Sequence, residues 1–552
     1  MKFIKKNILL ISIVIFAFVL RFFNLSSFPP SLNWDEISHG YNAYSILKTG
    51  TDEWGDLPIG NFRAYGDYPL TANLYVTIPF VALFGLTEFA IRFPHVLLGV
   101  GTVIATYFLA KGVTKRKDIA LLSSFLIAVD PWTLFTSRFV LQSNISIFLF
   151  ISAFACFFNR DKYPKLLTLA TVLFGLSLFA YHTTRIVTPL VMLLLVLVYR
   201  RSVITKSTLI LTILFAAALG VILLQSSSRA RANEVFLLNP GVIAQIESQR
   251  NESTWSPIVS KIIYNRPVYL LTHSAKNYIE YFSPAYLFIE GGTQYQFSVP
   301  HHGLLYVVWL PFFYIGLLTI VKRASKKDTV SLVLLGWLLI APIPASITVE
   351  RFAVLRATSL LPLPELFSAI GIFAFCELIL KNKRHAIRLV SIVVVITLLL
   401  LARYLSIYTT TYTKDYSWAW QYGYKEAVIF SQENYSRFDK IIVTKKYGEP
   451  HEFFLFYGKI DPMTYKTSKT LNRFTQSNWW WVDSFEKYVF MNDWQIPKQG
   501  ATFVTESKQL TDCTSQRCLL ITTPGNAPSK WSKIKTIYFL DMKPAFELYE
   551  NK

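Results

Sequence analysis

The chain has 552 residues, of which 53% are hydrophobic, 16% aromatic and only 16% charged, whereas about a quarter of the residues of a soluble domain are charged. Its 55 Lys and Arg residues outnumber 34 Asp and Glu residues, so the formal net charge is +21. The 44 Phe, 30 Tyr and 13 Trp residues exclude a disordered chain. A nucleic-acid-binding protein of this net charge would be richer in charged residues. A membrane protein remains.

Apolar runs long enough to cross a bilayer, about 20 residues, recur along the chain. The run at 70–86 contains Pro79 and follows Pro69, and we expect it to form a re-entrant or interfacial helix. We expect eleven other runs to span the membrane, at about 7–23, 90–110, 118–135, 141–158, 164–181, 184–199, 206–224, 303–321, 329–347, 355–380 and 386–405.

Short basic connectors set the predicted orientation, because such connectors stay on the cytoplasmic side. The N-terminus and all connectors of this kind fall on one side only if 70–86 does not span. We therefore expect a cytoplasmic N-terminus, an uncleaved signal anchor at the first run, and an extracytoplasmic tail in a multi-pass plasma-membrane protein. The basic connectors are 111–117, 159–165, 199–206, 322–327 and 381–388.

The predicted spans and their orientation indicate two domains. Residues 1–405 form a transmembrane domain with large outer loops at about 24–89 and 225–302, and residues 406–552 form a small extracytoplasmic α/β domain. In the tail, short apolar runs predict strands, at Lys440–Thr444, Cys518–Thr522 and Ile534–Leu540. Cys513 and Cys518 lie in a compartment that permits disulfides, and whether they are bonded stays open.

An acid pair, Asp35-Glu36, lies about a dozen residues beyond the first span. A carboxylate held against a helix bundle, where the dielectric constant is reduced, suits a general base. The alternative is a solvated pair of loop charges. The polar and aromatic surroundings favour the first interpretation, and they supply candidate acceptor-binding residues at Trp34, His39, Asp67 and Tyr68.

Arginines lie at the outer ends of several predicted spans. Because the planar guanidinium group matches a phosphate, we predict that Arg138, Arg185 and Arg356 bind a phosphate or diphosphate. His182 and His302 could donate to the same phosphate, or bind a metal ion together with carboxylates. The spacing of such a His-plus-carboxylate set is long-range and weakly specific, and a divalent metal ion stays open as a cofactor.

Short motifs resemble the GT-C glycosyltransferases that use polyprenyl-phosphate sugars, in the PMT-like and ArnT-like branch (glycosyltransferase families 39 and 83). The resemblance covers about 1–405 in layout. It is carried by the outer Asp35-Glu36 pair together with Phe84-Gly85, Glu88, Ile91-Arg92-Phe93-Pro94, Gly99, Asp130-Pro131, Ser137-Arg138, Tyr281-Phe282-Ser283-Pro284, Leu287–Gly292 and His301-His302-Gly303.

The resemblance implies a GT-C fold and transfer of a sugar from a polyprenyl phosphate to an acceptor hydroxyl, with inversion, on the outer face of the membrane. Asp35 would be the base, and Glu36 would orient Asp35 or the acceptor. The first loop shows no clear lysine where aminoarabinose transferases have a phosphate ligand, which makes a lipid A acceptor less expected. The sugar stays open, and so does the acceptor: protein, glycan or lipid.

Two alternatives to an enzyme remain. One is a lipid or glycan transporter or flippase without transferase activity, and the other is a non-catalytic assembly or sensor protein. Transporters place charged residues in the middle of their spans and often contain inverted repeats. Here the middles of the predicted spans are nearly free of charge, which favours the glycosyltransferase.

Overall fold

The computed structural model describes residues 2–66, 68–224, 237–380, 383–476 and 479–551. Contacts between residues divide the chain into two compact units. Unit 1 comprises Met1–Phe23, His95–Ser137 and Leu141–Ser406, and unit 2 comprises Asn24–Pro94, Arg138–Val140 and Ile407–Lys552. The first outer loop thus groups with the tail, and the predicted boundary at 405 and 406 stays a prediction.

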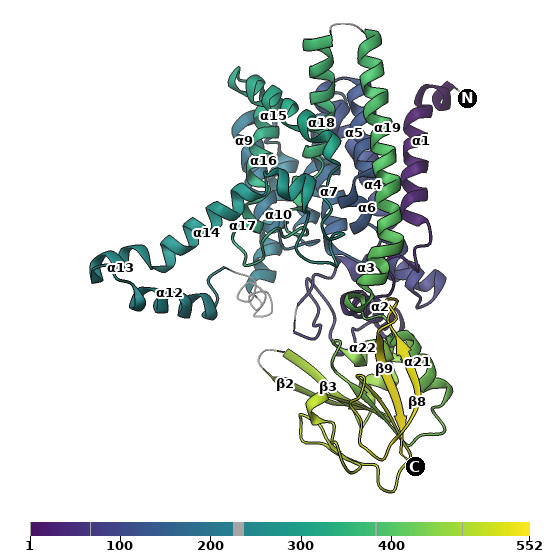
Figure 1. The fold of residues 1–552 in the computed structure, drawn as a ribbon. Helices are drawn as coiled ribbons and strands as arrows, with labels where there is room; N and C mark the ends of the chain where they lie inside the picture. The colour runs from purple at the N-terminus through teal and green to yellow at the C-terminus, as the bar shows by residue number, and fades with distance from the viewer. Residues whose placement is uncertain (1, 67, 225–236, 381–382, 477–478, 552) are drawn as a thin grey trace. The chain divides into compact units, whose positions relative to one another are not determined.

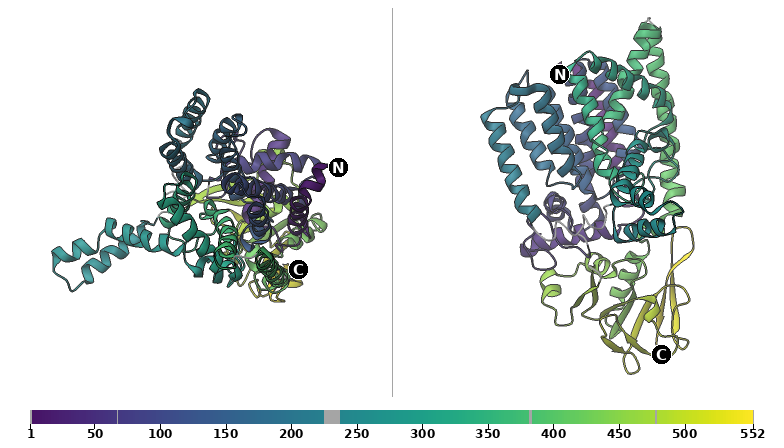
Figure 2. Two further views of the ribbon diagram at one scale, coloured as in Figure 1. Left: turned by 90° about the horizontal axis from the view of Figure 1, so that it is seen from above. Right: turned by 90° about the vertical axis from the view of Figure 1, so that its left-hand side faces the viewer.

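Unit 1 is a bundle of helices that run alongside one another (Figures 1 and 2). The helices α12–α14 form an arm that leads away from the other helices of this unit. The helices of unit 1 are α1 (Lys2–Phe22), most of α4 (Glu88–Thr114), α5 (Lys117–Val129), α6 (Pro131–Thr136), α7 (Gln142–Phe158), α8 (Lys165–Ser177), α9 (Thr184–Tyr199), α10 (Lys206–Leu224), α12 (Pro240–Glu252), α13 (Pro257–Ile263), α14 (Arg266–Glu280), α15 (Leu310–Ser325), α16 (Thr329–Ile340), α17 (Ile343–Ser346), α18 (Leu363–Phe375) and α19 (Lys383–Ile407).

The chain is a multi-pass membrane protein. Six helical stretches are long and apolar enough to cross a membrane: Glu88–Thr114, Lys206–Leu224, Val307–Ser325, Thr329–Ser346, Thr358–Ile379 and Arg384–Asp415. Shorter apolar helices lie at Asn7–Phe22, Ala72–Phe84, Gln142–Phe158, Lys165–Ser177 and Thr184–Tyr199. The predicted span at 118–135 is interrupted, because Asp130 ends α5 and then caps α6, accepting from the Thr133 backbone N–H at 2.6 Å.

Close backbone contact joins α15 to α18 within unit 1. A Cβ added to Gly316 would lie 1.9 Å from the Phe367 carbonyl oxygen, and one added to Gly371 would lie 1.8 Å from that of Phe312. Membrane helices associate through such small residues because lipid supplies no hydrophobic force between them. The buried Arg21 of α1 donates to the Ala128 carbonyl of α5 at 2.7 Å, and this hydrogen bond joins α1 to α5.

Unit 2 contains a seven-stranded sheet with strand order β2-β3-β4-β1-β7-β9-β8 (Figure 1). Strand β1 runs parallel to β4 and β7, and the other neighbouring strands are antiparallel. The strands are β1 (Lys440–Thr444), β2 (Asn472–Gln476), β3 (Trp479–Phe485), β4 (Tyr488–Met491), β5 (Thr502–Val504), β6 (Leu510–Asp512), β7 (Cys518–Thr522), β8 (Ser532–Tyr538) and β9 (Pro544–Glu550), with β5 and β6 forming a separate pair.

The strands predicted at Lys440–Thr444 and Cys518–Thr522 are confirmed with the same bounds, and the third is found two residues earlier, at Ser532–Tyr538. Cys513 and Cys518 form a disulfide. The helices of unit 2 are α2 (Trp34–Thr49), α3 (Ala72–Phe84), the start of α4, α20 (Thr413–Asp415), α21 (Tyr424–Glu433), α22 (Pro450–Tyr457) and α23 (Pro462–Thr467).

One hydrophobic core joins the first outer loop to the tail. Ile37 and Tyr41 of α2 lie in the same buried cluster as Phe453 and Phe456 of α22 and Ile441 of β1. The two helices approach closely, since a Cβ added to Gly40 would lie 2.7 Å from the Phe456 ring. The start of α2, which carries the predicted acid pair, therefore rests on the tail.

Candidate functional site

The predicted acid pair occupies the first turn of α2. Asn33 caps this helix: its side-chain oxygen accepts from the Glu36 N–H at 2.9 Å, and its own N–H donates to Glu36 Oε2 at 3.4 Å. This reciprocal capping box fixes where α2 begins. Because successive residues of a helix point about 100° apart, the two carboxylates face different surroundings.

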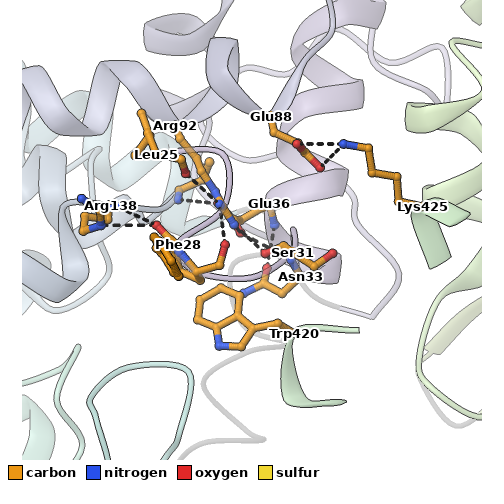
Figure 3. Close-up of polar contacts among 12 residues, drawn as sticks. Leu25, Phe28, Ser31, Asn33, Glu36, Glu88, Arg92, Arg138, Trp420 and Lys425 are labelled. Atoms are coloured by element: carbon orange, nitrogen blue, oxygen red, sulfur yellow. Dashed lines mark hydrogen bonds and ion pairs between the residues drawn. The ribbon is translucent and has the colours of Figure 1, made fainter. Parts of the chain in front are cut away.

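Glu36 forms a buried ion pair with Arg92 of α4 (Figure 3). Both side chains are 0% exposed. Arg92 Nε donates to Glu36 Oε1 at 2.9 Å and Nη2 donates to Oε2 at 2.8 Å, while the Val140 N–H also donates to Oε1 at 3.1 Å. Arg92 Nη1 donates to the carbonyls of Leu25 and Pro29. The Glu36 carboxylate thus links three chain segments: the start of α2, the start of α4 and the segment that contains Val140.

Asp35 is partly exposed, unlike its neighbour. The buried Tyr65 donates its hydroxyl to Asp35 Oδ1, and His39 Nδ1 donates to the Asp35 carbonyl at 2.7 Å. Tyr65 packs against the rings of Trp34 and Trp479, with centroid distances of 6.3 and 5.4 Å. The carboxylate of Asp35 is therefore oriented by a phenol whose ring is itself held in place.

Arg138 lies in the short segment Arg138–Val140 of unit 2 (Figure 3). Its Nε and Nη2 donate to the Phe28 carbonyl at 3.3 and 3.1 Å, and its guanidinium lies 5.7 Å from the centre of the Tyr408 ring. Since Val140 donates to Glu36, the segment that carries Arg138 is fastened to the start of α2. Of the three predicted phosphate-binding arginines, Arg138 is the one that shares a unit with Asp35.

The other predicted phosphate-binding residues belong to unit 1. Arg185 donates to the Leu178 carbonyl at 3.2 Å, and its Nη1 lies 3.4 Å from His182 Nδ1. Arg356 pairs with Glu350 at 2.6 Å. His302 Nδ1 lies 3.3 Å from the Pro300 carbonyl. The structure brings His182 and Arg185 together, and their role in phosphate binding stays a prediction.

The predicted acceptor-binding residues lie in the same loop of the sequence as Asp35. Trp34 lies against Gly448, where an added Cβ would be 2.0 Å from the indole ring. His39 is buried and meets the Phe62 ring edge-on at a centroid distance of 5.1 Å. Tyr68 is half-buried. Asp67 lies outside the described residues.

Sequence reasoning did not identify Tyr65, Trp479 or Glu449 as parts of this site. Trp479 Nε1 donates to Glu449 Oε1 at 2.5 Å, and a Cβ on Gly66 would lie 2.1 Å from the Trp479 ring. Residues that can hold a metal ion were missed as well. Among the described residues, Glu53, His451 and Glu452 place their ligand atoms within 4.8 Å of one another. Tyr65 is distant in sequence from Trp479, and Glu53 is distant from His451 and Glu452, so no local pattern predicts these groupings.

The chain is similar in sequence and in fold to known proteins. The family model for dolichyl-phosphate-mannose-protein mannosyltransferases (PMT) matches residues 11–224. The crystal structure of ArnT from Cupriavidus metallidurans bound to undecaprenyl phosphate is 11% identical, with a TM-score of 0.52 over 99% of this chain and 98% of that chain. Residues 11–224, about two fifths of the chain, therefore resemble the PMT family, and the likeness to ArnT shows that the two chains share a fold.

This chain matches less than two thirds of the length of two further relatives. The oligosaccharyltransferase of Archaeoglobus fulgidus, tethered with an acceptor peptide containing the NVT sequon, is 14% identical with a TM-score of 0.50. The match covers 83% of this chain and 64% of that chain. A chain from Aquifex aeolicus (strain VF5), described as an uncharacterized protein, is 30% identical over 120 residues, which are 21% of this chain and 23% of the relative.

The family match includes some of the predicted site residues and excludes others. Residues 11–224 contain Asp35, Glu36, Arg138, His182 and Arg185. Arg356, His302 and the whole tail lie outside the match. The predicted resemblance to the PMT family is confirmed for the matched residues, and the matched family is one of glycosyltransferases. The roles of single residues, the donor and the acceptor are proposals.

Proposed function

We propose that this protein transfers a sugar from a polyprenyl-phosphate donor to an acceptor hydroxyl on the outer face of the membrane, with inversion. The observation that carries the proposal is the contrast within the acid pair. Glu36 is buried and saturated by Arg92 and the Val140 N–H, whereas Asp35 is partly exposed and oriented by Tyr65. A general base must reach the proton that it removes, and of the two carboxylates Asp35 is the accessible one.

The chemistry assigns a task to each group. The acceptor oxygen attacks the anomeric carbon, its proton passes to Asp35, and the bond from that carbon to the phosphate oxygen breaks, so that the lipid phosphate leaves with the electron pair. Negative charge on this leaving group must be neutralised in the transition state. Arg138 is our first candidate, followed by Arg185 and Arg356, and then His182 and His302.

The relatives support the choice of donor and acceptor class. The ArnT structure holds undecaprenyl phosphate and covers nearly the whole of this chain. The matching family is described by its use of dolichyl-phosphate-mannose and by a protein acceptor. We therefore propose a polyprenyl-phosphate sugar as donor and a hydroxyl of a cell-envelope molecule as acceptor, with protein, glycan and lipid as the classes to compare.

Purified full-length protein in lipid vesicles, supplied with a panel of undecaprenyl-phosphate sugars and candidate acceptors, tests this function. We expect lipid phosphate to be released in equal amount to the glycosylated acceptor, and the product to carry the inverted anomeric configuration. A flippase or transporter would move the labelled donor across the vesicle membrane without releasing lipid phosphate, and this result would overturn the proposal.

We further propose eleven spans with a cytoplasmic N-terminus and an extracytoplasmic tail in the plasma membrane. The short basic connectors support this orientation. An added epitope after Lys552 should be accessible to antibody in spheroplasts without detergent, whereas an epitope at the N-terminus should need permeabilisation. Protection of the tail epitope until permeabilisation would contradict the eleven-span arrangement.

A further inference from the structure

A buried cluster in unit 2 combines a histidine with three carboxylates. Glu53 follows α2 in the first outer loop, Glu449 immediately precedes α22, and His451 and Glu452 lie in the first turn of α22. All four residues are less than 5% exposed. Ligand atoms of Glu53, His451 and Glu452 lie within 4.8 Å of one another. This set belongs neither to the Asp35 site nor to the ion pair of Glu36.

The hydrogen bonds of the cluster are incomplete. Glu53 Oε1 accepts from Asn42 Nδ2 at 3.1 Å, but within the described residues Oε2 of Glu452 and Oε2 of Glu449 have no hydrogen-bond partner. Native proteins leave few buried carboxylate oxygens unpartnered, because an uncompensated buried charge costs several kcal/mol. An additional positive group at this position would satisfy them.

The nearby cations are engaged elsewhere. Lys445 is bound to Asp483 at 2.5 Å. Arg473 donates to the backbone carbonyl of Glu53 at 2.9 Å and lies 4.0 Å from the centre of the Trp54 ring. Within the described residues, no hydrogen bond joins either cation to a carboxylate of the cluster. Neither cation therefore supplies a hydrogen bond to Oε2 of Glu452 or Oε2 of Glu449.

The spacing suits a shared ion better than a hydrogen bond. His451 Nε2 lies 3.8 Å from Glu452 Oε1. Two ligands that are each about 2.1 Å from a tetrahedral ion are about 3.4 Å apart. His451 Nδ1 faces Glu449 Oε2 at 3.5 Å, which is the arrangement in which a carboxylate orients a metal-bound imidazole.

We propose that Glu53, His451 and Glu452 bind one divalent transition-metal cation, and that Zn²⁺ suits this donor set best. Zn²⁺ accepts both imidazole nitrogen and carboxylate oxygen as ligands, and three protein ligands would leave a coordination position for water. Glu449 is the positioning residue that orients His451.

The site would fasten the first outer loop to the tail close to the proposed base. Glu449 accepts from Trp479, Trp479 packs against Tyr65, and Tyr65 donates to Asp35. The effect on Asp35 rests on the proposed function, but zinc binding does not. A metal measurement without donor or acceptor therefore separates the failure of one proposal from the failure of the other.

The test uses full-length protein in detergent, with the affinity tag removed and the metal stripped by a chelator. Titration with Zn²⁺ alone should show one tight site per chain and raise the melting temperature. Glu452→Gln keeps the side-chain size and removes a charged ligand, so zinc affinity should fall by about 100-fold or more, since even partners of the ligands change affinity 10- to 100-fold. Glu433→Gln, at an exposed position of α21, should bind zinc as the wild type does.

Cobalt gives a second measurement that does not depend on stability. Wild-type protein loaded with Co²⁺ should show visible absorption bands that Zn²⁺ displaces, and His451→Gln should lose them. Absence of a stoichiometric site in the wild type, or wild-type affinity in a folded Glu452→Gln variant, would overturn the proposal.

Discussion

The Asp35→Asn variant should transfer sugar about 10² to 10⁴ times more slowly than the wild type, the range that a positioned general base contributes. The amide keeps the size of the side chain and can still accept from Tyr65, but it cannot take the acceptor proton. We expect kcat to fall with little change in the KM for the lipid donor. Release of lipid phosphate by purified protein in vesicles measures the rate.

The matched control is Asp56→Asn in the same loop. The Asp56 side chain is 62% exposed and pairs with Arg63 at 3.6 Å, so its loss should leave turnover unchanged. Wild-type turnover in a folded Asp35→Asn variant would show that the base lies elsewhere and would remove Asp35 from the mechanism.

The Arg92→Met variant should be destabilised by about 3–5 kcal/mol, because it leaves the Glu36 carboxylate buried without its partner. Four further hydrogen bonds from Arg92 to the backbone and to Glu36 are lost with it. We expect a lower melting temperature and a lower yield of monodisperse protein, with activity lost in proportion to the folded fraction. Denaturation followed by the fluorescence of the tail tryptophans measures the change.

The Glu36→Leu/Arg92→Met double variant should recover part of this loss, since no charge is then left unpaired. Lys425→Met serves as the surface control: Lys425 is half-exposed and binds Glu88 at 3.1 Å, and such pairs contribute about 0–1 kcal/mol. Equal stability of the Arg92→Met and Lys425→Met variants would contradict a structural role for the buried pair.

The acid pair shows what the sequence could and could not predict. The candidate site could be predicted from the two adjacent carboxylates after the first span, because that pattern is local in the sequence. Their separate environments depend on Arg92, 56 residues from Glu36, and on Val140, 104 residues away. No local signal couples residues at these distances, so the sequence left the two acids nearly equivalent.

The same limit applies to the tail. Lys440–Thr444 and Cys518–Thr522 were predictable as strands, because short apolar runs rich in β-branched residues favour buried strands. The core that the tail shares with α2 could not be predicted from the sequence, because the pairing of Gly40 with Phe456 depends on shape rather than composition. The grouping of His451 and Glu452 with Glu53 could not be predicted either, because Glu53 is distant in the sequence.

The shared core has a consequence for how the protein is made. Tyr41 in the first loop bonds to the Ile460 carbonyl, 419 residues further along the chain. At 5 to 20 residues per second, the ribosome needs about 20 to 80 s to supply that partner. During this interval Ile37, Tyr41 and Ile91, which are buried in the finished protein, lack the tail side chains that later pack against them. A chain released before the tail is synthesised would therefore leave these apolar side chains of the first loop exposed.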